Sequence, residues 1–235
     1  MSNRFFQFKQ FTVWHDRCAM KVGTDAVLLG AWADADAVER VLDVGCGSGV
    51  IALMLAQRFP QSHVTGVELD VDAAMQACEN VNASPWADRL EVLQEDFCSY
   101  HPTAYFDLIV SNPPYFIDAL RSPFGERSLA RHAAGLNYET LFRRSREMLA
   151  TNGRVCVILP TEVETMAVDA AARNGLYVER KVCVFTKEGK PQRRVMLSFA
   201  TVVSPVETTN LFLMDADGSY AKAYRELTAD FYLKW

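Results

Sequence analysis

VLDVGCGSGV, residues 41–50, joins a short apolar strand to a helix through three glycines at alternate positions. The residues that follow, 48–59, have the apolar spacing of a helix, for which Ser48 is the expected N-cap. A glycine-rich turn lets a ligand approach the backbone, and the helix N-terminus behind it favours a negative group. Three glycines with Asp43 just before them are more than a tight turn requires. We therefore expect this turn to hold a ligand.

The same strand–helix unit repeats along the chain. Strands are expected at 40–44, 63–69, 90–96, 106–112, 153–160, 176–187 and 192–202, and further helices at 71–84, 138–150 and 161–175. This alternation predicts an α/β fold with a doubly wound, mostly parallel seven-stranded sheet, Rossmann-like, with helices on both faces. Only the turn KEGKP separates the final two strands, so the last strand should lie antiparallel.

Two segments flank this core. We expect an N-terminal extension at 1–39, the catalytic core at 40–202 and a C-terminal extension at 203–235 that packs on the core. Nothing between them has the composition of a linker, and 235 residues suffice for one well-packed structural domain.

Composition excludes several classes of protein. The six cysteines lie twenty or more positions apart, so neither a zinc site nor a disulfide framework is expected. The N-terminus lacks the apolar core of a signal peptide, and no run approaches the ~18 apolar residues of a membrane span. We therefore expect a cytoplasmic protein with no membrane partner and no obligate protein partner. With a net charge of −5, any attraction to RNA must come from local positive patches.

Two cofactor classes compete for the glycine-rich turn. A dinucleotide fold, as in an NAD-dependent oxidoreductase, needs G-x-G-x-x-G, but Val50 stands where the third glycine belongs. The pattern of Asp43 followed by Gly45, Gly47 and Gly49 instead resembles the S-adenosylmethionine loop of class I methyltransferases. The resemblance implies that this loop wraps the methionyl end of the cofactor, with Asp43 beside its amino group.

Two acidic residues at later strand ends fit the same cofactor. Glu68, with Leu69 after it, ends the second strand, where a carboxylate can accept both ribose hydroxyl protons. Asp96 and Phe97 follow the third strand. By the resemblance, Asp96 accepts a hydrogen bond from the exocyclic amine of adenine, and Phe97 lines the adenine ring.

Asn112-Pro113-Pro114-Tyr115 ends the fourth strand beside the expected cofactor site. The proline after Asn112 holds that residue extended, and neither proline offers a competing N–H donor. What remains is an acceptor-rich corner made by the Asn112 side-chain oxygen and the Pro113 carbonyl, with Tyr115 as a stacking face. Such a corner suits an NH₂ group held for methyl transfer by positioning and electrostatics.

This motif resembles the (Asn/Asp)-Pro-Pro-(Tyr/Phe) signature of amino-methyltransferases, whose substrates are adenine N6, guanine N2 or the glutamine amide of release factors. CAMKVGTDAVLLGAWA, residues 18–33, resembles the N-terminal block of bacterial tRNA1(Val) (adenine-37-N6)-methyltransferases. That resemblance runs through nearly the whole chain and implies that Gly23, Thr24 and Asp25 cover the cofactor, with Lys21 close by. Thr24 is equally suited to be an ordinary helix N-cap. Only 39 residues precede the core, which disfavours the helical domain of release-factor enzymes.

Two arginine- and lysine-rich segments are the candidates for RNA contact. Their cations are Arg121, Arg127 and Arg131 after the catalytic motif, and Lys187, Lys190, Arg193 and Arg194 in the final turn. Phosphate contacts of this kind would position tRNA without reading its sequence. A non-catalytic RNA-binding protein that retains the cofactor fold stays open as an alternative.

Overall fold

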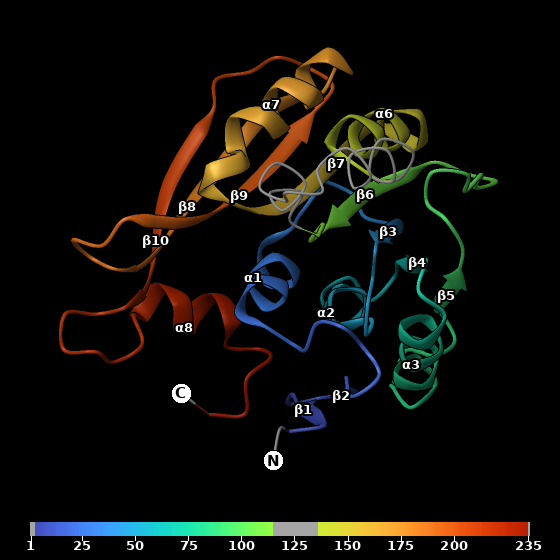
Figure 1. Cartoon of the computed structure of the whole chain (residues 1–235), viewed down its shortest axis with the longest axis horizontal. Coiled ribbons are helices and arrows are strands. Elements are labelled where there is room, and N and C mark those ends of the chain that lie inside the picture. The colour runs from blue at the N-terminus through green and yellow to red at the C-terminus, as the bar shows by residue number, and fades with distance from the viewer. Residues whose placement is uncertain (1–2, 115–135, 235) are drawn as a thin grey trace, which may run out of the picture.

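A mixed sheet of eight strands forms the centre of the computed structural model, which describes residues 3–114 and 136–234. The strands are ordered β10-β8-β9-β7-β6-β3-β4-β5 (Figure 1). Their bounds are β3 Arg40–Val44, β4 His63–Glu68, β5 Leu90–Gln94, β6 Phe106–Ser111, β7 Leu149–Pro160, β8 Tyr177–Lys187, β9 Gln192–Ala200 and β10 Glu207–Met214.

Helices cover both faces of the sheet. They are α1 Thr24–Trp32, α2 Val50–Arg58, α3 Val71–Asn82, α6 Tyr138–Met148, α7 Glu164–Arg173 and α8 Lys222–Thr228. One hydrophobic cluster joins α1, α2, α3 and α8 to their face of the sheet, and a second joins α6 and α7 to the opposite face. The α/β arrangement with helices on both faces, predicted from strand–helix alternation, is therefore confirmed.

The C-terminal half of the sheet differs from the prediction in one respect. The seven predicted strands are present, and the last of them, β9, is antiparallel to both β7 and β8. The C-terminal extension, however, contributes an eighth strand, because β10 pairs in parallel with β8. Its sequence begins with Glu-Thr-Thr-Asn, whose side chains are exposed at the sheet edge, so the strand lacks the apolar run that marks its neighbours.

The N-terminal extension packs against the same core. Its short hairpin, β1 Phe5–Gln7 and β2 Thr12–Trp14, is followed by a segment that reaches α1. Phe8 is 1% exposed and stacks on Phe11, while its ring edge meets Phe231 near the C-terminus. The two ends of the chain thus meet at one apolar cluster. Within the described ranges, no helix has the length and apolar character to cross a membrane.

Strand order reverses at β3, and this reversal positions the candidate site. From β3 the chain moves outward through β4 to β5, and then crosses to β6 on the other side of β3. The carboxyl ends of β3 and β6 lie side by side, with Val44 paired to Ser111. Ligands of open α/β sheets bind in the crevice at such a switch point.

Candidate active site

The turn after β3 has a backbone that only glycine adopts easily. Gly45, Gly47 and Gly49 have φ angles of 69°, 55° and 78°, all in the left-handed region. The Gly45 and Cys46 amides donate to the Val67 carbonyl at 2.9 and 3.2 Å, which fixes the turn to the neighbouring strand β4.

The outer side of this turn is open. A Cβ atom built on Gly45 or Gly47 would meet no atom of the described residues within 4 Å, whereas one on Gly49 would lie 3.4 Å from the Ala77 Cβ. The first two glycines therefore form a cradle, and the third packs the turn against α3. On the inner side of the turn, Gly66 of β4 allows close packing, since its missing Cβ leaves room for the Cys46 sulfur.

Asp43 caps the helix that follows the turn. Helix α2 begins at Val50 with Gly49 as its N-cap, so the prediction of Ser48 as N-cap is wrong. The Asp43 Oδ2 atom instead accepts the Ala52 amide at 3.0 Å, which satisfies a free N–H of the first turn from the preceding strand. Because the loop approaches the helix through a left-handed glycine, the Ser48 side chain makes no capping hydrogen bond.

The other Asp43 oxygen, Oδ1, has no partner in the part of the chain that the structure describes. It is buried without a hydrogen bond there, in a side chain that is 0% exposed. Burial raises the pKa of Asp43 from 3.8 to about 7, against the lowering effect of the Ala52 amide and with a further increase from the nearby Glu68 charge. A buried acceptor of this kind, next to the glycine cradle, calls for a donor from a bound ligand.

Glu68 and Asp96 stand at the ends of β4 and β5, as predicted, and their carboxylates are already partly engaged. Glu68 accepts the Gly47 amide at 2.8 Å through Oε2 and the Asp70 amide at 2.9 Å through Oε1. Asp96 accepts the Cys98 amide at 2.8 Å. Each carboxylate oxygen can accept further hydrogen bonds, so both side chains retain capacity for a ligand.

The two apolar residues predicted beside them differ in exposure. Leu69 is 63% exposed, as a residue that covers a ligand from outside would be in the free protein. Phe97 is 4% exposed and belongs to the core cluster on the α6–α7 face, so its ring is surrounded mainly by protein. Phe97 is thus a core aromatic, and its expected role of lining the adenine ring stays a prediction.

Asn112 follows β6 directly beside the glycine cradle. The Ser111 hydroxyl donates to the Val44 carbonyl at 2.9 Å and ties the ends of β3 and β6 together. One residue later, the Asn112 Oδ1 atom is buried and has no hydrogen-bond partner among residues 3–114 and 136–234. Pro113 is buried and Pro114 exposed, while Tyr115 lies outside the described residues. The corner therefore presents an unused acceptor at the sheet's switch point.

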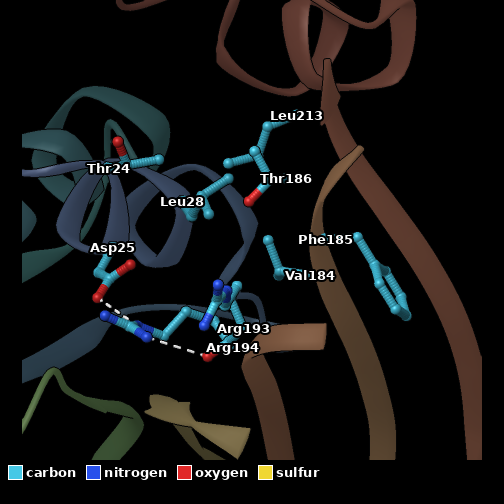
Figure 2. Close-up of a pocket in the computed structure, with 9 residues that line it drawn as sticks. All are labelled: Thr24, Asp25, Leu28, Val184, Phe185, Thr186, Arg193, Arg194 and Leu213. Carbon is cyan, nitrogen blue, oxygen red and sulfur yellow. Dashed lines mark hydrogen bonds and ion pairs between the residues drawn. The ribbon is translucent and has the colours of Figure 1, made fainter. Parts of the chain in front are cut away.

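The residues of block 18–33 that were predicted to cover the cofactor differ in exposure and in contacts. Lys21, Gly23 and Thr24 are exposed, and Gly23, not Thr24, is the N-cap of α1. Asp25 forms an ion pair with Arg194 of β9, with 2.7 Å between Oδ2 and Nε. Two residues that were predicted for different partners, the cofactor and RNA, thus contact each other (Figure 2).

A pocket of about 260 Å³ lies next to this ion pair, between α1 and the carboxyl end of β8 (Figure 2). Its lining residues are Thr24, Asp25, Leu28, Val184, Phe185, Thr186, Arg193, Arg194 and Leu213. Lys190 and Arg193 of the neighbouring β8–β9 turn are exposed, and Lys187 is half-buried. Arg121, Arg127 and Arg131, the other RNA candidates, lie outside the described residues.

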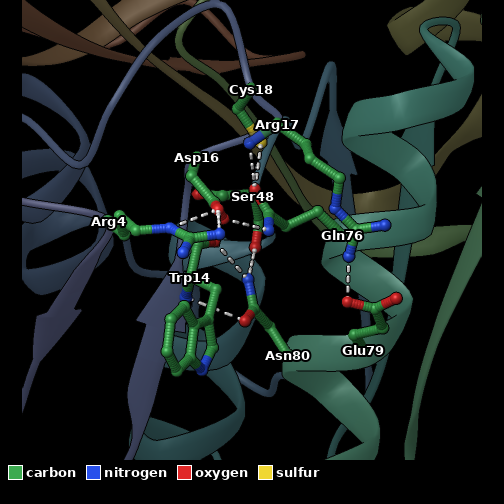
Figure 3. Close-up of polar contacts among 9 residues, drawn as sticks. All are labelled: Arg4, Trp14, Asp16, Arg17, Cys18, Ser48, Gln76, Glu79 and Asn80. Carbon is green, nitrogen blue, oxygen red and sulfur yellow. Dashed lines mark hydrogen bonds and ion pairs between the residues drawn. The ribbon is translucent and has the colours of Figure 1, made fainter.

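Two buried amides on α3 were missed by the sequence analysis. Gln76 and Asn80 are each 1% exposed and lie one helical turn apart. Their side-chain oxygens accept backbone amides of the N-terminal extension: Gln76 accepts that of Arg17, just after β2, and Asn80 accepts that of Trp14, the last residue of β2 (Figure 3). Their i, i+4 spacing on a helix beside the glycine-rich turn was the available signal.

Comparison with known proteins agrees with this geometry. The family model of the methyltransferase small domain matches residues 18–168. A predicted O-methyltransferase from Agrobacterium tumefaciens, protein Atu636, superposes with a TM-score of 0.70 at 18% identity, over 88% of this chain and 96% of that one. Fold and family model together define a methyltransferase of the class I type.

Two curated relatives narrow the family. The tRNA1(Val) (adenine(37)-N6)-methyltransferase of Bacteroides thetaiotaomicron is 47% identical over 99% of both chains. The protein of the same name from Pectobacterium carotovorum is 45% identical, over 97% of this chain and 93% of its own. This chain belongs to the family of tRNA1(Val) (adenine(37)-N6)-methyltransferases.

Proposed function

We propose that this protein transfers the methyl group of S-adenosylmethionine to N6 of adenine 37 in tRNA1(Val). The observation that carries the proposal is a pair of acceptors, Asp43 Oδ1 and Asn112 Oδ1, which are buried without a partner among the described residues, on and just after the paired strands β3 and β6 beside the open glycine cradle. The names of the relatives that match almost the full chain supply the substrate.

The residues at the cradle fit S-adenosylmethionine. Asp43 offers a buried acceptor for the methionyl ammonium, directly or through water, and the missing Cβ atoms of Gly45 and Gly47 leave room for the methionyl backbone. Glu68 and Asp96 offer further acceptors for ribose hydroxyls and for the adenine amine. Lys21, Gly23, Thr24 and Leu69 are exposed and are proposed to close over the bound cofactor.

Asn112 and Pro113 are proposed to hold the amino group that receives the methyl. Asn112 Oδ1 accepts one N6–H, and the Pro113 carbonyl accepts the other, so the nitrogen lone pair turns away from both acceptors. When bound, S-adenosylmethionine supplies an electrophilic methyl group, whose bond to sulfur breaks as the N6 lone pair attacks, and one N6 proton then leaves to solvent. No strong base is needed, because the protein contributes positioning and electrostatics. Pro114 stiffens the corner, and Tyr115 is proposed to stack on the adenine.

The substrate tRNA is proposed to reach this corner across the end of the sheet formed by the last residue of β7 and the β8–β9 turn. Arg194 is level with Pro160 at the end of β7, two strands from Asn112, or roughly 10 Å at about 4.8 Å per strand. We propose that Lys187, Lys190 and Arg193 contact phosphates here, and that the adjoining pocket takes part of a nucleotide next to adenine 37. Arg121, Arg127 and Arg131 remain proposed contacts in the same role. With tRNA as its substrate, the protein is expected to work in the cytoplasm.

The alternatives are weaker. An NAD-dependent oxidoreductase needs a close glycine where Val50 stands, and a non-catalytic RNA-binding protein has no need of the buried Asn112 acceptor. Guanine N2 and a glutamine amide present the same NH₂ to the corner, and the relatives' names favour adenine over both.

The decisive experiment is mass spectrometry of nucleosides from tRNA incubated with the enzyme and labelled S-adenosylmethionine. Labelled N6-methyladenosine in tRNA1(Val), and none when adenine 37 is replaced by guanine, is the expected result. Labelled N2-methylguanosine, or label confined to a release factor, would instead assign one of the two other amino-group substrates.

A further inference from the structure

We infer that Asn80 is a positioning residue for the glycine-rich loop, and that it couples this loop to the N-terminal extension. Asn80 lies on α3 and touches neither the cradle's open side nor the Asn112 corner. The inference rests on the proposed function, because it assumes that the loop holds S-adenosylmethionine. It adds a residue outside the predicted site to the set that determines cofactor affinity.

The Asn80 amide uses both of its ends. Its Nδ2 atom donates to the Ser48 carbonyl at 2.9 Å and to the Trp14 carbonyl at 2.8 Å, and its Oδ1 atom accepts the Trp14 amide at 2.9 Å. The side chain is 1% exposed, so water does not replace these bonds (Figure 3). A single buried side chain therefore fixes the loop and the strand end of the extension to the same point on α3.

Ser48 is the part of the loop that most needs such a partner. It lies between Gly47 and Gly49, whose φ angles of 55° and 78° leave this stretch with more conformational freedom than any other residue type would allow. The Gly47 amide donates a hydrogen bond to the Glu68 carboxylate, and the Gly49 amide donates one to the Cys46 carbonyl. Asn80 supplies the corresponding bond for the Ser48 carbonyl, so the cradle is preorganised before the ligand arrives.

Gln76 provides a matched comparison on the same helix. It is equally buried and also binds the extension, since it accepts the Arg17 amide at 2.8 Å and donates to Asp16 Oδ1 at 3.0 Å. It makes no hydrogen bond to the glycine-rich loop. Changes at Gln76 thus loosen the extension alone, whereas changes at Asn80 loosen both the extension and the loop.

The test compares Asn80→Asp with Gln76→Glu, each of which replaces the donating NH₂ by oxygen at nearly constant volume. Calorimetry gives the Kd for S-adenosylhomocysteine, steady-state kinetics give KM for S-adenosylmethionine and kcat, and thermal unfolding gives Tm. We expect Asn80→Asp to raise Kd and KM about tenfold, as the loss of roughly one net hydrogen bond of preorganisation implies, with kcat within twofold at saturating cofactor. Gln76→Glu should leave the Kd for S-adenosylhomocysteine within twofold of the wild-type value, even if its Tm falls as much as that of Asn80→Asp.

A cofactor-free measurement separates this inference from the proposed function. Hydrogen–deuterium exchange at the Gly47 and Gly49 amides should accelerate in the free Asn80→Asp protein and stay unchanged in Gln76→Glu. If Asn80→Asp does not fold, Asn80→Ala takes its place, because it removes the donor without placing an acid against two carbonyls. An unchanged Kd in the Asn80 variants, or an equal rise in the Gln76 variant, overturns the inference. A wild-type chain that binds no S-adenosylhomocysteine overturns the proposed function instead.

Discussion

At the scale of single residues, Asn112 carries the chemistry of the proposed reaction. Its Oδ1 atom is buried without a partner, an arrangement that costs free energy in the unliganded protein and is recovered only when a donor arrives. We expect Asn112→Ala to lower kcat by roughly 10²–10³, the usual effect of losing one preorganised polar contact, while the Kd for S-adenosylhomocysteine stays unchanged. Single-turnover methylation of tRNA measures the first quantity and calorimetry the second.

Asn112→Asp is the control for this prediction. Aspartate keeps an acceptor oxygen at the same position and loses only the amide NH₂, so this variant should retain far more activity than the alanine variant. Equal losses in the two variants would mean that the amide nitrogen, or the packing of the side chain, matters more than its oxygen.

The proposed contact of Asp43 with the cofactor should make binding depend on pH. Burial raises the pKa of Asp43 to about 7 in the free protein, so below pH 7 the carboxyl is mostly protonated and offers no negative charge to an ammonium group. Binding then requires the loss of a proton. The Kd for S-adenosylhomocysteine should therefore fall about tenfold for each unit of pH between roughly 5 and 7, and level off above.

The raised pKa of Asp43 also affects the stability of the fold. Its effect on stability as pH rises is opposite to that of a carboxyl group whose pKa is lowered by folding. Between pH 3.8 and about 7 the unfolded chain has released the Asp43 proton while the folded chain retains it, so the folded state loses stability as pH rises through this window. Asp43→Asn removes the titration, and its Kd for S-adenosylhomocysteine should show no slope between pH 5 and 7. A slope that survives this substitution would mean that Asp43 is not the group behind the pH dependence.

At the scale of elements, the turn between β3 and α2 is specified by conformation and by space. Gly47→Ala should strain a left-handed residue, at about 1–2 kcal/mol of unfolding free energy, and place a methyl group in the cradle. Overpacking of about 1–3 kcal/mol predicts a rise of roughly tenfold or more in the Kd for S-adenosylhomocysteine. Calorimetry and denaturant unfolding measure the two effects separately.

Gly175→Ala is the matched control. Gly175 has a φ of 70°, its Cβ would also meet no described atom within 4 Å, and it ends α7 away from the cradle. This variant should lose a similar unfolding free energy and bind the cofactor normally. A Gly47→Ala protein that also bound normally would show that the cradle side of the turn does not face the ligand.

Elements with a strong local pattern were predictable from sequence, and those decided by tertiary contact were not. The left-handed Gly175 after α7 and the β8–β9 turn follow from local rules and are present. The cap of α2 escaped prediction, because Asp43 reaches the Ala52 amide from the preceding strand β3, across the whole glycine-rich turn. Strand β10 was also not predicted. Its pairing with β8 depends on the free edge of β8 in the folded sheet, which the local sequence of β10 does not indicate.

The candidate site shows the same division. Its acidic and amide residues stand at strand ends, where the alternation of strands and helices brings them together, and their positions could be predicted from the sequence. The pairing of Asp25 with Arg194 could not, because these residues lie 169 positions apart and are joined only by the packing of α1 against the sheet. Asn80 was missed in a similar way, since its i, i+4 spacing from Gln76 marks a helix face but does not reveal that its partners are Trp14 of β2 and Ser48 of the glycine-rich turn.

At the scale of the whole molecule, the protein has to bind a polyanion with an acidic chain. The net charge is −5, so attraction to tRNA depends on where the cations gather. Lys187, Lys190 and Arg193 gather at the carboxyl edge of the sheet, which is also the edge of Asn112. On helix α6, by contrast, Arg143 and Arg144 share the single carboxylate of Glu147, which offsets part of their charge. Lys187, Lys190 and Arg193 thus place positive charge at the edge of the sheet that carries the proposed reaction centre.

This arrangement predicts salt-sensitive binding of tRNA with a small slope. Each phosphate contact to single-stranded RNA contributes about −0.7 to the slope of log K against log salt, so two or three contacts at the turn give roughly −1.5 to −2. The double variant of Lys190→Ala and Arg193→Ala should raise the KM for tRNA and bring the slope more than one unit closer to zero, with the Kd for S-adenosylhomocysteine unchanged. Filter binding between 50 and 200 mM salt, a range chosen to keep the slope measurable, checks it.

Arg173→Ala is the control for that experiment. Arg173 is 60% exposed at the end of α7, where it pairs with Glu139, and it lies at the opposite edge of the sheet from Asn112. An exposed ion pair of this kind contributes little to stability, so the variant should fold normally and leave the salt slope of tRNA binding as it is in the wild type. If Arg173→Ala flattened the slope as much as the turn variants do, tRNA would be held by diffuse charge over the surface. If neither changed it, the phosphates would be held elsewhere, with Arg121, Arg127 and Arg131 as the remaining cations to substitute.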